Sequence, residues 1–263
     1  MKTIIKDIID GFADKGFVFA NEQDFQFEMA LALKTGNYGV EDVKLETISL
    51  EEDWNEVEKK VRARKGLGRK TKQYHDILVK FPKDEYVLIE LKYKTPLKLC
   101  LYETKQGKTI TFVQGAYDIG AYDYLEDISR LENISKRYMS NNIQSKIKES
   151  YSVFLTNDKN YRFNHFDKEK KGIKSPWINY SIHNGKKFNA GEIFFIIDGK
   201  EESKYITPNK KHFDSIVLKH DYEPFVWRDY KLSGYDNYED KRVGRKGCTC
   251  PGFSYLIVEV KPI

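Results

Sequence analysis

Two carboxylic acids and a lysine stand among the most hydrophobic residues of one short stretch of this sequence. Residues 76–92 read DILVKFPKDEYVLIELK, and the charged residues in question are Asp76, Glu90 and Lys92. Burying charges without partners costs on the order of several kcal/mol, so something must stabilise them. Mg²⁺ takes oxygen ligands from carboxylates and backbone carbonyls, and the residue types therefore favour a cation site made of Asp76, Glu90 and the carbonyl of Leu91.

The chemistry expected of such a site is hydrolysis at phosphorus. A bound Mg²⁺ polarises a phosphoryl group and lowers the pKa of its water, which makes that water a nucleophile. An ammonium group such as that of Lys92 can orient the water or stabilise charge that develops on the phosphate oxygens. The alternative is that Asp76, Glu90 and Lys92 form a buried ion-pair network, which requires good geometry and additional hydrogen bonds.

Two predicted strands position these residues. The segments at 74–81 and 86–93 are rich in β-branched and aromatic residues and flank the turn-forming letters PKDE, which predicts an antiparallel hairpin. Because side chains alternate along a strand, Glu90 and Lys92 share one face. If the loop is three residues long, Asp76 lies opposite Glu90 on that face, whereas a four-residue loop would break this register.

A predicted helix upstream of the hairpin carries a third candidate carboxylate. Residues 21–35 begin with Asn21 as a predicted N-cap and continue in good helix formers. Glu28 falls at three- and four-residue spacing with apolar residues such as Phe25 and Met29, so it is expected on their inward face. Glu28 is therefore either a site residue or an edge glutamate that reaches water or a lysine.

A basic segment immediately precedes the hairpin. In residues 59–72, KKVRARKGLGRKTK, eight of fourteen positions are Lys or Arg and none is acidic, which is typical of an anion-binding patch or of a solvated loop. Backbone phosphates of a nucleic acid are one class of anion that such a patch contacts. The candidate contact residues are Arg62, Arg64, Lys65, Arg69 and Lys70.

These residues and the elements that carry them resemble the PD-(D/E)XK nuclease superfamily, which has a restriction-endonuclease-like fold. The pattern is Asp76, thirteen residues, Glu90, one residue and Lys92, with Glu28 upstream. The family core, a mixed β-sheet flanked by helices, has the order helix, strand, strand, strand, helix, strand, and a similar order is expected over residues 20–157. The expected elements are a helix at 21–35, strands at 40–48, 74–81 and 86–93, a helix at 112–139 and a strand at 151–156.

The resemblance implies a metal-dependent nuclease that uses Mg²⁺, or Mn²⁺ in its place, to cleave phosphodiester bonds in DNA, with RNA as the other candidate substrate. A non-catalytic module of the same fold that binds nucleic acid or protein is the alternative. The metal ligands implied are Glu28, Asp76, Glu90 and the carbonyl of Leu91, with Lys92 beside the nucleophile.

Two positions are compared with the family pattern. Gln114 resembles a glutamine that some members carry in a Q-x-x-x-Y pattern after the second hairpin strand, although Tyr117 comes one residue early. The resemblance implies that Gln114 contacts phosphate or supports the ligands, and ordinary polarity at a helix start is the other interpretation. His75 stands where the family name implies proline.

Composition and patterning bound the rest of the chain. Hydrophobic residues make up 40% of the 263 residues and charged residues 32%, which is typical of a well-solvated globular protein. Without linkers or repeats, a single elaborated domain over 1–263 is expected, with a β-rich extension over 158–263 that includes strands at 192–198 and 254–260. No apolar leader or membrane-length run is present, so a cytoplasmic protein without membrane contact is expected. A homodimer that cuts both strands is compatible with the sequence.

Two further patterns are weaker. The letters CTCPG contain Cys248 and Cys250, but one C-x-C without a second ligand pair favours a turn over a zinc site. The letters IVEVK repeat E-x-K at Glu259 and Lys261, but no strand and tight turn link them to an upstream acid. They are therefore interpreted as a strand end.

Overall fold

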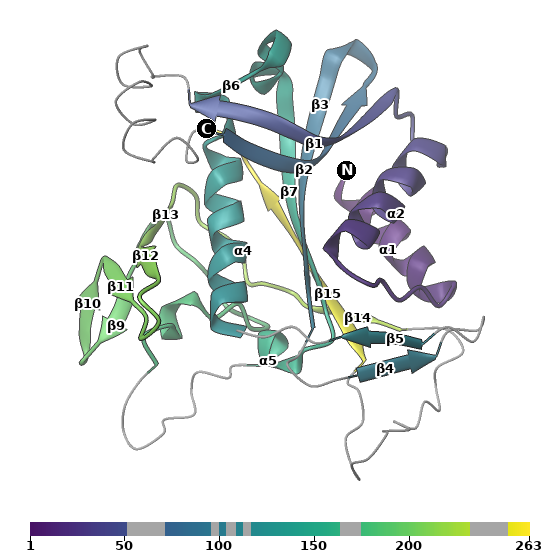
Figure 1. The fold of residues 1–263 in the computed structure, drawn as a ribbon. Helices are drawn as coiled ribbons and strands as arrows, with labels where there is room; N and C mark the ends of the chain where they lie inside the picture. The colour runs from purple at the N-terminus through teal and green to yellow at the C-terminus, as the bar shows by residue number, and fades with distance from the viewer. Residues whose placement is uncertain (52–71, 96–99, 104–108, 113–116, 164–174, 232–251) are drawn as a thin grey trace.

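The computed structural model describes residues 1–51, 72–95, 100–103, 109–112, 117–163, 175–231 and 252–263. These residues form a mixed α/β structure around a seven-stranded sheet with the strand order β14-β15-β7-β3-β2-β1-β6 (Figure 1). The sheet strands are β1 (Asp42–Glu51), β2 (Lys72–Phe81), β3 (Glu85–Lys94), β6 (Arg137–Met139), β7 (Ile147–Thr156), β14 (Arg228–Tyr230) and β15 (Phe253–Val260). The helices are α1 (Lys2–Asp14), α2 (Glu22–Thr35), α4 (Tyr117–Glu132) and α5 (Lys159–Arg162). No described helix is both long enough and apolar enough to span a membrane.

The chain connectivity follows the predicted order. Strands β1, β2 and β3 form an antiparallel meander, and β3 then pairs in parallel with β7 after the chain has passed through α4. A parallel pair needs a crossover connection, which α4 supplies. Helix α2 comes before β1, and its predicted N-cap is confirmed because the Asn21 side chain accepts a hydrogen bond from the backbone N–H of Asp24 at 2.8 Å.

Two element predictions are wrong in extent. The helix predicted over 112–139 is shorter, because α4 ends at Glu132 and is followed by a 3₁₀ turn at Ile134–Lys136 and by β6. The strand predicted over 192–198 is divided between β8 (Gly191–Ile193) and β9 (Phe195–Ile197), which belong to different two-stranded sheets. Short apolar runs predict burial more reliably than they predict strand partners.

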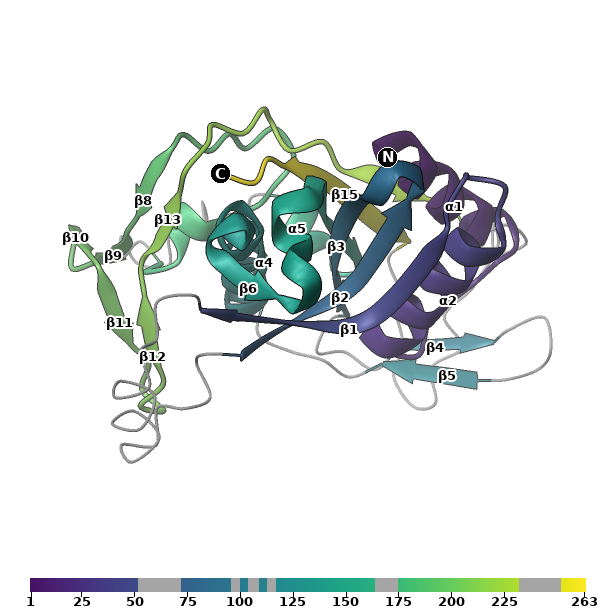
Figure 2. The ribbon, with the colours of Figure 1, turned by 90° about the horizontal axis from the view of Figure 1, so that it is seen from above.

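Apolar residues on the two faces of the main sheet pack against helices on both sides. Ile77, Val87 and Ile89 pack with the buried faces of α1 and α2 in one cluster. Leu78 and Leu88 point the other way and pack against α4 and the segments after residue 177. Figures 1 and 2 show α1 and α2 on one side of the sheet and α4 on the other. The hairpin of β2 and β3 is thus covered on both faces.

The C-terminal part of the chain supplies strands to the main sheet as well as small hairpins. Strand β15 lies between β14 and β7. The small two-stranded sheets pair β8 with β13 (Ile216–Leu218), β9 with β10 (Lys200–Glu202), β11 (Lys204–Ile206) with β12 (His212–Asp214), and, earlier in the chain, β4 (Cys100–Glu103) with β5 (Thr109–Phe112). The predicted extension therefore shares its core with α4.

Replacing Gly120 by alanine is expected to destabilise the fold by about 1–3 kcal/mol, because an added methyl group overpacks the interface of α4 with α5. A Cβ atom at Gly120 would lie 2.1 Å from the hydroxyl oxygen of the buried Tyr161. Gly11 in α1 is the matched control, since a Cβ there has open space. Urea unfolding should show that Gly11→Ala is at least as stable as wild type. If Gly120→Ala and Gly11→Ala were equally stable, the close packing of Gly120 against Tyr161 would be contradicted.

Candidate active site

The hairpin of β2 and β3 has the predicted register. A three-residue 3₁₀ turn, Pro82–Asp84, joins the strands, and Phe81 pairs with Glu85. The last rung of this ladder in the described structure is Ile77 opposite Ile89. Beyond this rung the two strands separate. Asp76 and Glu90, the pair predicted to face each other, are the next residues along β2 and β3.

The alternation of side chains is interrupted at the same point. On the β1 side, rungs form at Leu45–Ile77 and at Thr47–His75, but the rung between Glu46 and Asp76 is missing. Glu46 has φ 51°, a left-handed conformation that is uncommon outside glycine. Because of this irregularity, counting residues along β2 gives the wrong direction for Asp76.

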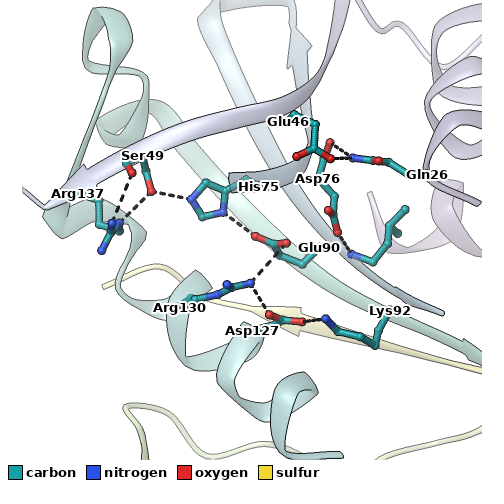
Figure 3. A network of polar contacts seen from close by, with 11 residues as sticks. Gln26, Glu46, Ser49, His75, Asp76, Glu90, Lys92, Asp127, Arg130 and Arg137 are labelled. Atoms are coloured by element: carbon teal, nitrogen blue, oxygen red, sulfur yellow. Dashed lines mark hydrogen bonds and ion pairs between the residues drawn. The ribbon is translucent and has the colours of Figure 1, made fainter. Parts of the chain in front are cut away.

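Asp76 and Glu90 therefore do not share one face, contrary to the register argument. The Asp76 carboxylate turns into the gap between the strands, where Oδ2 accepts a hydrogen bond from the backbone N–H of Leu91 at 2.6 Å. Glu90 turns toward α4, where Oε1 lies 2.6 Å from Nδ1 of His75 (Figure 3). The residue that joins Glu90 on the α4 side of the sheet is His75, one position before the predicted Asp76.

Helix α2 holds the backbone of Asp76 through a glutamine. The Nε2 group of the buried Gln26 donates to the backbone carbonyl of Asp76 at 2.8 Å and to Oε1 of Glu46 at 2.9 Å. Beside this contact lies a pocket of about 490 Å³ that is rich in oxygen atoms. Its lining residues are Asn21, Glu22, Gln23, Gln26, Glu46, Asp76, Tyr93 and Lys94.

Burial and neighbouring carboxylates disfavour the ionised form of Asp76 in this pocket. Burial is the main reason that the pKa of Asp76 rises to about 8, and the carboxylates of Glu90 and Glu22 raise it further. The hydrogen bond from the Leu91 N–H opposes the shift but does not cancel it. A cation bound beside Asp76 would favour the ionised form and so lower this pKa.

Glu90 and its neighbour His75 lie entirely within the protein. Burial raises the pKa of Glu90, and the positive charge of Arg130 acts against that shift. Burial, with help from Arg130 and Arg137, lowers the pKa of His75 to about 3. The His75 ring is therefore neutral at physiological pH.

Lys92 is held by a carboxylate of α4. Its Nζ atom lies 2.9 Å from Oδ2 of Asp127, whose other oxygen contacts Arg130. Burial lowers the pKa of Lys92, but the carboxylates of Asp127 and Glu22 outweigh it and raise the pKa above its ordinary value. Lys92 and Glu90 thus belong to the buried ion-pair network that the sequence left open, with partners from α4 (Figure 3). A metal is not needed to explain the burial of these two charges.

Ser49, His75 and Glu90 stand in the order of a hydrolase triad. The Oγ atom of Ser49 lies 2.7 Å from Nε2 of His75. However, Ser49 and His75 have no exposed surface, and Oγ of Ser49 already accepts a hydrogen bond from Nε of Arg137 at 2.9 Å. A substrate cannot reach this serine, so the arrangement does not support nucleophilic attack by Ser49.

Glu28 is not brought to Asp76. The contact with Asp76 comes from Gln26, and residues two positions apart project in directions about 200° apart around a helix, so Glu28 points away from Asp76. The half-buried Glu28 lies on the opposite flank of the apolar stripe from Gln26. Within the described ranges, no three His, Cys, Asp or Glu side chains are grouped closely enough to hold a metal ion.

The other predicted contact residues lie outside the described residues. These are Gln114, Arg62, Arg64, Lys65, Arg69 and Lys70.

The structure also brings four residues to the site that the sequence did not predict there: Gln26, His75, Asp127 and Arg130. The sequence signal for Asp127 was a polar residue at helical spacing with the apolar Tyr124 and Leu131. His75 carried only the signal of lying next to Asp76.

Comparison of the chain with protein-family models, with curated proteins and with solved structures gave no match. What chemistry the site performs therefore has to follow from its own geometry.

Proposed function

We propose that this protein is a metal-dependent nuclease that hydrolyses phosphodiester bonds in DNA, with a restriction-endonuclease-like core. The observation that carries the proposal is the position of the Asp76 carboxylate. It accepts a hydrogen bond from the backbone N–H of Leu91, the residue between Glu90 and Lys92 in β3, at the point where β2 and β3 part. A carboxylate at a strand separation next to an E-x-K strand is the arrangement that the resemblance implies.

The connectivity of the core supports the same proposal. The meander of β1, β2 and β3 is followed by the crossover helix α4 and the parallel strand β7, with α2 on the other face. Apart from the β4–β5 hairpin before α4 and the short strand β6 after it, this order agrees with the helix, strand, strand, strand, helix, strand order that the resemblance implies. Because one fold hosts many functions, the connectivity supports the proposal only together with the residues at the strand separation.

The donor atoms at the separation fit Mg²⁺. In an extended strand the N–H and C=O of one residue project from the same edge, so the Leu91 carbonyl faces the gap into which its N–H donates to Asp76. Mg²⁺ is usually bound by one or two carboxylates together with waters and substrate phosphates. Asp76 and the Leu91 carbonyl would therefore hold it at the gap together with waters and substrate phosphate. Glu90 is the second carboxylate that we assign to it, although its side chain turns toward α4 in this structure.

A bound Mg²⁺ would supply polarisation of the phosphate and acidification of a water molecule. The protein's own groups have complementary roles. The raised pKa of Lys92 keeps its ammonium group protonated, so Lys92 stabilises negative charge and does not act as a general base. Asp76 supplies a carboxylate whose ionisation the cation would favour.

A non-catalytic interaction module of the same fold is the second candidate. The observation that favours it is the buried network, because Glu90 and Lys92 find partners in His75, Arg130 and Asp127 without a metal. A protein without turnover would retain these pairs for stability alone.

The deciding experiment is a cleavage assay with Mg²⁺ or Mn²⁺ on supercoiled, linear and single-stranded DNA and on RNA. Wild type should cleave DNA, and EDTA should stop the reaction. Calorimetry should detect Mn²⁺ binding to wild type. Cleavage should be lost in Lys92→Ala and kept in the matched control Lys148→Ala, which changes an exposed lysine of β7. Absence of both cleavage and Mn²⁺ binding in wild type would favour the interaction module.

A further inference from the structure

A continuous series of buried hydrogen bonds ends on Glu90. Nε of Arg137 lies 2.9 Å from Oγ of Ser49, which lies 2.7 Å from Nε2 of His75, and Nδ1 of His75 lies 2.6 Å from Oε1 of Glu90. The four residues come from β6, β1, β2 and β3 (Figure 3). All four are buried, so each polar group depends on its neighbours in the series.

The direction of the series follows from what each group can donate. A guanidinium group only donates, so Ser49 Oγ accepts from Arg137. The single hydroxyl proton of Ser49 is then free to point at Nε2 of His75, and no other acceptor for it is found among the described contacts. If Nε2 accepts, the ring proton of neutral His75 is on Nδ1, which donates it to Glu90.

The opposite arrangement leaves groups unsatisfied. A proton on Nε2 of His75 would make Ser49 accept twice and leave its own proton without a partner. It would also place the bare Nδ1 atom 2.6 Å from Glu90, which would then have to be protonated. With the proton on Nδ1, by contrast, every polar group of the series has a partner, and a terminal nitrogen of Arg130 lies 3.8 Å from Oε2 of Glu90.

We propose that His75 is a positioning residue for Glu90, and that Ser49 and Arg137 fix the ring so that Nδ1 donates to Oε1. This inference rests on the proposed function, since it assigns Glu90 as a ligand. The ring of His75 holds Oε1 of Glu90, a terminal nitrogen of Arg130 lies 3.8 Å from Oε2, and the backbone N–H of Asp76 donates to the same carboxylate. Oε2 is the oxygen that the proposal assigns to the cation. Loss of such a supporting contact typically lowers metal affinity or activity by about 10- to 100-fold.

Three substitutions at His75 separate positioning from packing. The amide nitrogen of His75→Asn takes the place of Nδ1 and can still donate to Glu90, whereas the amide of His75→Gln takes the place of Nε2. His75→Leu fills the site without either group. We expect Mn²⁺ affinity, measured by calorimetry, and kcat to fall about 10- to 100-fold in the Gln and Leu variants and to be largely retained in the Asn variant.

Thermal unfolding of the same variants supplies the structural comparison. The Asn and Gln variants each keep one of the two ring contacts and each leave one buried partner unsatisfied, so their stabilities should be similar while their activities differ. The Leu variant loses both contacts and should be the least stable. If activity simply follows stability across the three variants, His75 serves packing and the inference is wrong.

A spectroscopic measurement tests the hydrogen-bond direction without cleavage. Side-chain ¹⁵N spectra of metal-free wild type should show His75 as the neutral tautomer protonated at Nδ1, and Ser49→Ala should reduce the preference for it. A proton on Nε2 would overturn the inference while the proposed nuclease function could stand. Wild type that shows neither cleavage nor Mn²⁺ binding would overturn both, because Glu90 would have no cation to bind.

Discussion

Replacing Asp76 by asparagine is expected to lower metal-dependent cleavage by about 10³-fold or more, as is common when a group that binds the reacting centre is removed. The amide oxygen of asparagine can still accept the hydrogen bond from the Leu91 N–H, so the local geometry should be retained. What is lost is the negative charge that would bind the cation. Cleavage of supercoiled DNA and Mn²⁺ calorimetry measure the two consequences separately.

The same substitution is expected to stabilise the metal-free protein at high pH. Because the pKa of Asp76 is raised to about 8 in the fold, the folded state holds a proton that the unfolded state releases near its ordinary pKa. Wild type therefore loses stability as the pH rises from about 4 to about 8, and Asp76→Asn should lose less, because of these two carboxyl groups only Glu90, whose pKa burial also raises, still has to ionise in the fold. The variant should be more stable than wild type by about 1–3 kcal/mol at about pH 8, with little difference near pH 4.

Asp84 is the matched control on the same hairpin. It is exposed, and ion pairs with Lys146 and Lys80 lower its pKa. Asp84 has φ 56°, which asparagine tolerates well. Asp84→Asn should leave cleavage unchanged. Full activity in Asp76→Asn would remove this carboxylate from the site, and urea unfolding in EDTA at the two pH values tests the stability difference.

The sequence was sufficient to predict the hairpin but not the direction of its side chains. A three-residue turn and apolar alternation determine the pairing of Phe81 with Glu85. Counting onward to Asp76 assumes an unbroken ladder. The left-handed backbone of Glu46 breaks it on the neighbouring strand, and a positive φ at a glutamate has no local sequence signal.

The partners of the buried charges could not be predicted for a related reason. Asp127 is buried and Arg130 is half-buried on α4, whose other buried residues are mostly apolar, and their three-residue spacing in the sequence indicates that they share one helix face. Which strand residues they meet depends on how α4 is rotated against the sheet. That rotation is set by packing along the whole helix, including residues such as Phe154 of β7 and Tyr124.

Replacing Asp127 by alanine is expected to destabilise the protein by about 3–5 kcal/mol, the usual effect of removing one partner from a buried ion pair. Both oxygens of Asp127 are engaged, one with Lys92 and one with Arg130. The substitution would leave two largely buried cations without this shared carboxylate. Glu126→Ala, which removes an exposed carboxylate from the same helix, should change stability by less than about 1 kcal/mol in the same urea experiment.

A double variant separates the structural role of this pair from its chemical role. Lys92→Met combined with Asp127→Leu replaces the ion pair by apolar side chains, which is often neutral or stabilising in a buried site. Arg130 keeps its contact with Glu90. The double variant should therefore recover much of the stability lost in Asp127→Ala but should not recover cleavage, because the ammonium group is absent. Cleavage at the wild-type rate would show that the charge of Lys92 serves the fold alone.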